Sequence, residues 1–429
     1  MHPATPAVQV LTNPDTLRLI FRHIPELLPH CRRVSTAFNH LPPLDALITI
    51  VLTERLTHLF QVERHLRRIQ GQAPSPVRFS STSLTHMALL RDQWTAPRAS
   101  CKLHLVIKSS ALATTGCERQ MRNDLGVLVL PGMPAVTSMD LTDLGARACS
   151  ILFTSGPPIL KDIESIKFGR CIYQWQFTNL LLTQLGCRGV KLVTLDVSNT
   201  GSHTGSRPSL PQHVFDLRRF VLRDSLQHLV VRHAKIEAAC AQVLGIFLQR
   251  VSLLSLDLTG TRLEGDVFEL LVPGLQTCAA LRRLGLGENH WFGACGAEHL
   301  SGVLPDMKSL QELDVSGTAL QHEGLAALCQ GLAPAADLRV LNVGRAGLTS
   351  LSVKTLCLTL PALTSLTELH LADNKIAMHD RVPSFEALVR AQPGLRRVDL
   401  RGKYKLASPA VCQRLRQSMQ GRAGAQLLF

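Results

Sequence analysis

One apolar spacing recurs through most of the chain and restricts the folds open to it. The spacing is Leu-x-x-Leu-x-Leu, with Val, Ile, Met or Phe standing in for some leucines. It opens at Val136, Ile163, Leu192, Leu226, Leu253, Leu281, Leu310, Leu338, Leu366 and Leu395. Successive openings lie 27, 29, 34, 27, 28, 29, 28, 28 and 29 residues apart. A fixed period of this length indicates a protein built by stacking copies of one structural unit.

Each unit joins a strand-like pattern to a helix-like pattern. In LQELDVSGTALQHEGLAALCQGL, residues 310–332, the first apolar residues alternate as they do on one face of a short strand. The second half has its apolar residues at helical spacing. One such unit cannot bury its apolar face alone, so neighbouring units must stack. The sequence therefore predicts an α/β solenoid, with a parallel sheet on its concave side and helices outside.

The pattern resembles the leucine-rich repeat family, over about two thirds of the chain. The 27–29-residue step is like the family's long, ribonuclease-inhibitor-like subtype, which implies a right-handed horseshoe that binds other proteins. The family places an Asn where the chain turns after each strand, and Asn289 and Asn374 match it here. At the same position other repeats carry Thr200, Thr261, Thr318, Ala234 and Ala346.

A different pattern precedes the repeats, in residues 11–41. Asn13-Pro14 is a plausible helix start, and apolar residues follow at helical spacing in two stretches. This segment resembles an F-box, a helical module that binds the adaptor of cullin-RING ubiquitin ligases. The positions that match the motif are Leu11, Pro14, Leu17, Ile20, Phe21, Ile24, Val34 and Phe38. The alternative is a plain helical cap that covers the end of the solenoid.

These patterns divide the chain into four parts. Residues 1–43 are the F-box-like module, and 44–135 are predicted to be a helical linker with one or more degenerate first repeats. Within that linker, 44–52 (LDALITIVL) is interpreted as a core helix and 102–107 as a strand. The repeats occupy 136–403, with an inserted loop near 200–212, and 404–429 form a basic C-terminal cap or tail.

The positive charge of the chain lies at its two ends. The formal net charge is +14, yet the repeat region 136–394 carries 23 Lys or Arg against 23 Asp or Glu. Residues 1–135 carry 15 against 8, and residues 395–429 carry 8 against 1. A basic surface can bind nucleic acid, but aromatic stacking residues are scarce here. We therefore expect no nucleic-acid binding by the repeats, and any such contact only at the basic ends.

No pattern in the sequence predicts catalysis. The phosphate-binding, nucleophile-elbow and metalloprotease motifs are missing from the sequence. The 12 cysteines form no C-x-x-C pair, and Cys278, Cys329 and Cys357 lie in helix-like stretches, which favours small core residues in a reducing compartment. We expect no enzyme, no metal, no cofactor and no membrane contact. The predicted location is cytoplasmic, with a nuclear or a mitochondrial location left open.

The concave lining can be read from the repeat. The residue between the two close apolar positions is predicted to face the concave side. This row is Asp140, Lys167, Asp196, Val230, Asp257, Gly285, Asp314, Asn342, His370 and Asp399. Aspartate could be common there simply because the family favours it, or the row could attract a basic or amide-rich partner. The candidate partner-binding residues are Asp196, Asp257, Arg283, Asp314, His370, Arg397 and Asp399, with Arg401 beside them.

Two functions fit these features. The first is a substrate-recognition subunit of a ubiquitin ligase, with the F-box-like module bound to the adaptor and cullin and with the repeats holding a protein target. The second is a structural scaffold subunit in a large cytoskeletal or ribonucleoprotein assembly.

Overall fold

The computed structural model describes a large part of the repeat region and short pieces elsewhere. The described residues are 46–52, 78–80, 101–107, 135–142, 162–168, 190–198, 225–376, 386, 389, 392, 394–402, 409–419 and 425–428. The chain divides into two compact units, Met1–Leu192 and Val193–Phe429. The F-box-like residues Leu11, Pro14, Leu17, Ile20, Phe21, Ile24, Val34 and Phe38 lie outside the described residues, as does the insertion near 200–212.

Parallel strands make up the described part of the first unit. Their order is β2, β1, β3, β4, β5. The bounds are β1 Ala46–Leu52, β2 Arg78–Ser80, β3 Cys101–Ile107, β4 Ala135–Asp140 and β5 Ser165–Lys167. The predicted strand at 102–107 is therefore confirmed. The helix predicted over 44–52 is wrong, because the run Ile48, Thr49, Ile50, Val51 consists of β-branched residues, which favour a strand.

The second unit carries one strand in each repeat. The strands are β6 Thr194–Asp196, β7 His228–Val230, β8 Ser255–Asp257, β9 Arg283–Gly285, β10 Glu312–Asp314, β11 Val340–Asn342, β12 Glu368–His370, β13 Arg397–Asp399 and β14 Gln426–Leu428. Each strand pairs in parallel with the next, and the central apolar residues face one another, as in Leu284 with Leu313. This confirms the predicted parallel solenoid register.

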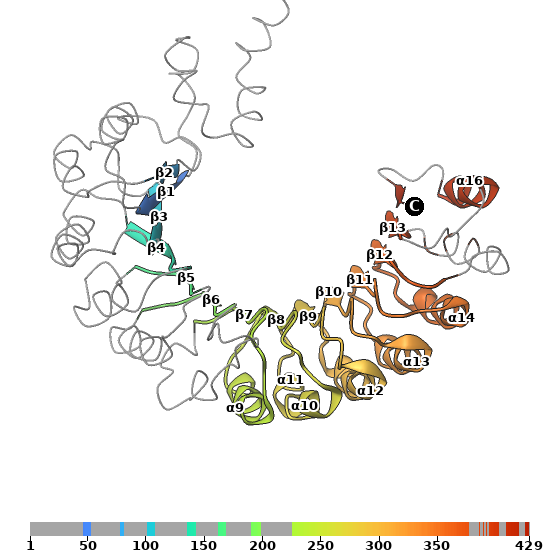
Figure 1. The fold of residues 1–429 in the computed structure, drawn as a ribbon, viewed down its shortest axis with the longest axis horizontal. Helices are drawn as coiled ribbons and strands as arrows, with labels where there is room; N and C mark the ends of the chain where they lie inside the picture. Colours follow the sequence, from blue (N-terminus) through green and yellow to red (C-terminus); the bar gives the residue numbers. More distant parts are fainter. Residues whose placement is uncertain are drawn as a thin grey trace, which may run out of the picture. The chain divides into compact units, whose positions relative to one another are not determined.

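Helices return the chain from the end of one strand to the start of the next. They are α9 Ala238–Leu248, α10 Gly265–Glu269, α11 Val272–Leu275, α12 Gly293–Val303, α13 Gln321–Leu332, α14 Ser350–Thr359 and α16 Pro409–Ser418. The short 3-10 turns η8 Leu304–Asp306 and η9 Leu360–Ala362 extend α12 and α14. In the second unit the strands lie on the inner side of the arc and the helices α9–α14 on its outer side (Figure 1).

The core lies between the sheet and the helices. The three leucines of each opening motif are buried, as at Leu253, Leu256 and Leu258. Burying one such side chain stabilises the fold by about 1.5–3 kcal/mol. Of the cysteines expected in the core, Cys278 and Cys329 are buried and Cys357 is half-buried.

Asparagine holds the turn after the strand at two places, as the family resemblance implies. Asn289 is fully buried; its amide donates to the carbonyls of Leu258 and Leu286 at 2.9 and 2.7 Å, and its oxygen accepts from Leu263 N at 3.0 Å. Asn374 makes the corresponding bonds three repeats further along the chain. Where Thr stands instead, as at Thr318, one hydroxyl bond to the carbonyl of Val315 remains. These side chains satisfy backbone groups that would otherwise be buried without partners.

The last residues of the chain add to the repeat array rather than trailing from it. The tail predicted for 404–429 contains α16 and β14, and β14 pairs in parallel with β13. No opening motif predicts β14, because the stretch AQLLF lacks the Leu-x-x-Leu-x-Leu spacing.

Candidate functional site

The predicted concave row coincides with one position in every strand. Each of its ten residues, from Asp140 to Asp399, is the last residue of its strand, β4 to β13. In β8, the middle residue Leu256 is buried and its neighbours Ser255 and Asp257 are half-buried. Because side chains alternate across a strand, those two residues face away from the core. Two outward rows therefore run along the sheet.

The aspartates of this row have a structural task of their own. In six strands the side-chain oxygen accepts the backbone N–H two residues further on, at 2.8–3.1 Å. The acceptors are Asp140, Asp196, Asp257, Asp314, Asn342 and Asp399. This bond ends the strand and explains why Asp recurs there, since an Asx side chain readily bonds its own backbone two residues on. It occupies one carboxylate oxygen and leaves the second available.

A hollow opens in the middle of the sheet's outward face. It has a volume of about 390 Å³ and is lined by residues of β7 to β12. We call it the central hollow and define it by Arg232, Asp257, Arg283, Gly285, Glu312 and Asp314. The predicted residues Asp257, Arg283 and Asp314 all line it, and His370 lies on its border.

At the floor of the hollow lies Gly285, the last residue of β9, which has no side chain on this face, and Gly287 follows two residues later. A Cβ atom at Gly285 would lie 3.0 Å from Asp257 Oδ1, and one at Gly287 would lie 3.3 Å from Asp314 Oδ1. At both positions a side chain would therefore crowd the neighbouring carboxylate, and glycine leaves room for it. Adjacent strands are about 4.8 Å apart, so these two carboxylate-bearing strands are separated by about 10 Å.

Two ion pairs neutralise part of the central hollow. Arg232 contacts Asp257 Oδ2 through Nη2 at 2.5 Å and through Nε at 2.7 Å. The hydrogen bond to Asp257 is the main reason that the pKa of Arg232 is raised, and the charges of Asp196 and Asp314 add to it. Arg283 Nε lies 3.1 Å from Glu312 Oε1. Among the described residues, Asp314 forms no ion pair, and its one hydrogen bond is to Ser316 N.

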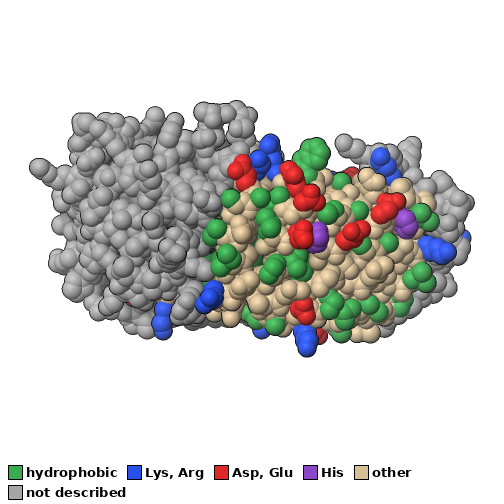
Figure 2. Space-filling view, turned by 90° about the horizontal axis from the view of Figure 1, so that it is seen from below, with side chains coloured by type: hydrophobic (Ala, Val, Ile, Leu, Met, Phe, Trp, Pro, Cys, Tyr) green, Lys and Arg blue, Asp and Glu red, His purple; other side chains and the backbone are tan. Residues whose placement is uncertain are grey.

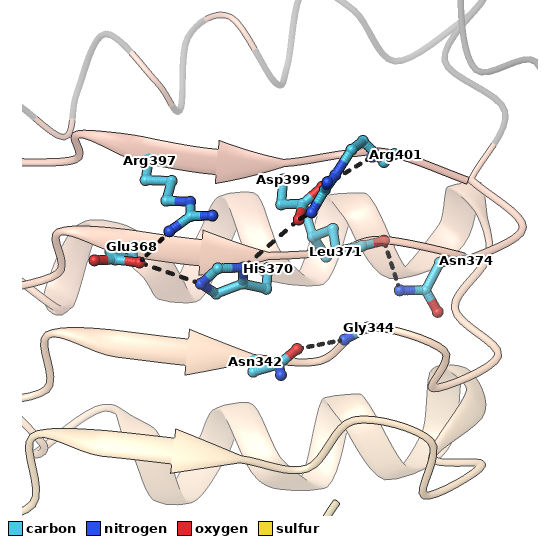
Figure 3. A network of polar contacts seen from close by, with 9 residues as sticks. All are labelled: Asn342, Gly344, Glu368, His370, Leu371, Asn374, Arg397, Asp399 and Arg401. Atoms are coloured by element: carbon cyan, nitrogen blue, oxygen red, sulfur yellow. Dashed lines mark hydrogen bonds and ion pairs between the residues drawn. The ribbon is translucent and has the colours of Figure 1, made fainter. Parts of the chain in front are cut away.

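A second polar group lies at the C-terminal end of the same face (Figure 3). We call it the C-terminal network; it consists of Glu368, His370, Arg397, Asp399 and Arg401. His370 Nε2 lies 3.3 Å from Glu368 Oε2, and its Nδ1 lies 3.9 Å from Asp399 Oδ2. Arg397 Nη1 lies 3.7 Å from Glu368 Oε2. Arg401 donates from Nε to Asp399 Oδ1 at 2.9 Å and from Nη2 to Asp399 Oδ2 at 2.7 Å. The hydrogen bond from Arg401 lowers the pKa of Asp399.

The structure thus separates the predicted site residues into groups. Asp257, Arg283 and Asp314 meet in the central hollow, whereas Arg397, Asp399 and Arg401 belong to the C-terminal network. His370 connects the two, and Asp196 lies on β6, outside the hollow lining.

Several residues of the site were missed from the sequence. Arg232, Glu312 and Glu368 occupy positions two residues before or after the predicted row. Strand alternation would have found the two glutamates, because residues two apart on a strand share a face. The pairing of Arg232 with Asp257 joins neighbouring repeats and has no local signal.

Figure 2 shows the outer helical side of the described part of the second unit, on which acidic side chains are exposed. Helices α10, α12 and α13 carry Asp266, Glu269, Glu298 and Glu323 and no Lys or Arg. Glu298 and Glu323 are exposed there. No group of three or more metal-ligating side chains occurs among the described residues. Within the same part of the chain, no helix is long and apolar enough to cross a membrane.

Comparison with known proteins agrees with this architecture. The sequence model of the family described as "Leucine Rich repeat" matches residues 306–329 and 362–377. The chain is 33% identical to the ribonuclease inhibitor of Mus musculus over 154 residues, which cover 35% of this chain and 34% of that protein. It is 28% identical to the ribonuclease inhibitor of Sus scrofa over 250 residues, covering 53% of this chain and 54% of that one. The chain thus spans about a third to a half of these relatives.

A solved leucine-rich repeat-containing protein from Legionella pneumophila superposes with a TM-score of 0.39 and 15% identity, over 78% of this chain and 94% of that one. The parallel strands and returning helices of the chain itself show the leucine-rich-repeat solenoid fold. Its homologues include ribonuclease inhibitors.

Proposed function

We propose that this protein is a non-enzymatic recognition subunit that binds a protein partner on the outward face of its sheet, at the central hollow. The observation that carries the proposal is Asp314, a carboxylate without an ion-pair partner among the described residues, beside a 390 Å³ hollow. Asp399, at the same strand position, is instead paired with Arg401. The names of the relatives, which describe inhibitors of a ribonuclease, favour a protein as the partner.

Charge favours a partner surface that is basic or rich in amides. Asp257 and Asp314 lie on either side of Gly285. A nucleic-acid backbone would be repelled from this part of the sheet by those charges. Complementary charge raises the rate of association and selects against partners of the wrong sign.

Charge reversal tests this surface. The double variant Asp257→Lys/Asp314→Lys should weaken binding of the protein partner by roughly 100-fold, as measured by quantitative co-purification, because the new lysines face the partner's basic groups. The matched control is Glu298→Lys/Glu323→Lys, which makes the same change of charge on the exposed helical side. Equal recovery of the partner with wild type and with the hollow variant would move the site to the 200–212 loop or to the helices.

We further propose that residues 11–41 link this recognition surface to a cullin-RING ubiquitin ligase. Support comes from the F-box-like order of Leu11, Pro14, Phe21, Ile24 and Val34. Affinity purification of the full chain should recover adaptor and cullin, and Phe21→Asp should lose both while it keeps the target. Stoichiometric recovery of one fixed assembly without an adaptor would favour the scaffold function instead. That the chain is no enzyme stays a prediction.

A further inference from the structure

We propose that the central hollow receives a single cationic side chain, an arginine or a lysine, from the protein partner, with Asp314 as its counter-ion. This inference rests on the proposed function, since it specifies which part of a partner enters the site.

Charge balance sets the number of cations. The Lys, Arg, Asp and Glu residues that line the hollow are Arg232, Asp257, Arg283, Glu312 and Asp314. Two pairs are complete, Arg232 with Asp257 and Arg283 with Glu312. The lining is therefore one positive charge short of neutrality, and the shortage is at Asp314. A second cation would have to displace one of the two arginines.

The available atoms set the kind of contact. Asp314 Oδ1 is held by the N–H of Ser316 at 2.9 Å, which fixes the orientation of the carboxylate. A Cβ at Gly287 would approach Oδ2 to 3.4 Å, so the glycine leaves this second oxygen uncovered. A carboxylate fixed in place by its own backbone loses little conformational freedom when it accepts a charge-assisted hydrogen bond.

The shape of the hollow suits a long, thin side chain. β8 and β10 lie about 10 Å apart on either side of β9, so an extended aliphatic stem can lie over Gly285 between the outward side chains of these two strands. The walls include the methyl-bearing Thr259 and Val340, which can contact such a stem. Arginine and lysine both combine an apolar stem with a charged end.

No other strand in the described part of the second unit offers this combination. In β7 the corresponding residue is Val230, which fills the space, and in β12 it is His370, which is held by Glu368 and Asp399. Asn342 in β11 bonds Gly344 but carries no charge. Gly285 in β9 is thus the one residue without a side chain in this outward row from Asp196 to Asp399, as far as the described strands extend.

A pair of small probes tests the inference without the natural partner. Arginine amide and citrulline amide have nearly the same shape, and only the first is charged at its side-chain end. Titrated into the full chain and followed by NMR, arginine amide should shift the backbone amides of Gly285, Gly287 and Ser316 in a saturable way. Citrulline amide should cause much smaller shifts at these amides.

Asp314→Asn supplies the protein arm of the test. Asn342 shows that an asparagine at this strand position keeps the bond to the backbone, at 3.1 Å, so the variant removes the charge with little change in the strand end. It should abolish the difference between the two probes. Asp399→Asn, in the C-terminal network, should preserve that difference.

The outcomes separate this inference from the proposed function. If arginine amide and citrulline amide give the same shifts in the wild type, or if Asp314→Asn keeps the difference, the inference is wrong. Loss of the natural partner on Asp257→Lys/Asp314→Lys would then still support the proposed function, with contacts other than an inserted cation. The inference and the proposed function are both supported if Asp314→Asn, but not Asp399→Asn, abolishes the difference in shifts between arginine amide and citrulline amide, and if Asp314→Asn also binds the partner about tenfold more weakly.

Discussion

The central hollow and the C-terminal network occupy the same face of the same sheet. Each has an aspartate at the last position of a strand, but the two aspartates differ in their partners. In the C-terminal network every carboxylate has a cation beside it, and the Asp399 side chain is only 5% exposed. In the central hollow Asp314 has none among the described residues, and Gly285 leaves space next to it. At the C-terminal end the carboxylates are paired with cations of the same face. In the middle, we propose, a protein partner supplies the cation for Asp314.

The largest expected effect comes from removing a buried aromatic ring from the core of the repeat that contains β9. Phe292 is buried and packs edge-on against Phe268, with ring centroids 5.1 Å apart. Phe292→Ala should lower the free energy of unfolding by about 3–5 kcal/mol, because a large buried ring leaves a cavity. The control is the preceding residue, Trp291, which is 72% exposed; Trp291→Ala should change it by about 0.5 kcal/mol or less. Urea unfolding measures both, and a similar loss in the two variants would contradict the assignment of Phe292 to the core.

The next effect should be equal in the two regions. Asn289 lies under β8 and β9, and Asn374 under β11 and β12, and each holds backbone groups of two neighbouring repeats. Replacing either by Ala leaves buried backbone groups without partners and should cost about 3 kcal/mol. Thermal or urea unfolding compares them. A much smaller cost at Asn289 than at Asn374 would mean that the hollow is held less firmly than the C-terminal end.

The charged pairs should differ between the regions as pH changes. The pKa of Asp399 is lowered in the folded protein, chiefly by Arg401. A carboxyl whose folded pKa is lowered adds stability above its unfolded pKa and loses it as pH falls through the folded value. Asp399→Asn should therefore cost about 1 kcal/mol near neutral pH and less in acid. Asp314→Asn, which breaks no ion pair, should be within about 0.5 kcal/mol of wild type near neutral pH. A cost for Asp399→Asn that grows on acidification would contradict the role of the Arg401 pair.

The smallest effect concerns the turn that follows each strand. One residue there, three positions after the strand end, has a positive φ in successive repeats: His233, Gly260, Glu288, Gly317, Arg345 and Asp373. Aspartate tolerates this conformation better than most residues, at a modest cost. Asp373→Gly should therefore stabilise the fold by about 0.5 kcal/mol. Differential scanning calorimetry would measure the change, and a clear loss of stability would show that the Asp373 side chain contributes more than its backbone strain costs.

The sequence predicted the fold more fully than the site. Its leucine spacing located every strand from β4 to β13 and the residue that ends each one, because the buried middle leucine fixes the register. It failed for β1 and β14, which lack the motif. Some repeats are 29 residues long instead of 28, and the leucine spacing alone did not show where in such a repeat the additional residue lies. In the step that opens at Leu281, Phe292 is buried where other repeats bury a leucine, and Trp291 is displaced outward.

The site could be predicted only in part, since its chemistry depends on contacts between repeats. The outward row was correct, but the pairing of Arg232 with Asp257 spans 25 residues and that of Arg283 with Glu312 spans 29. These partners are set by the stacking of coils rather than by local pattern. Gly285 was predicted to belong to the outward row. That it lies at the floor of a hollow depends on the carboxylates of the neighbouring strands, which the local sequence around Gly285 does not show. Nothing local distinguishes the unpaired Asp314 from the paired Asp399.

The most direct test compares partner affinity in Asp314→Asn and Asp399→Asn, two variants with the same chemical change at the same strand position. Both keep an acceptor for the strand-end bond, as Asn342 does. Quantitative co-purification of the full chain with its protein partner should show about a tenfold loss for Asp314→Asn and less than about a twofold loss for Asp399→Asn. An equal loss in both variants, or a larger loss for Asp399→Asn, would contradict the assignment of partner binding to the central hollow.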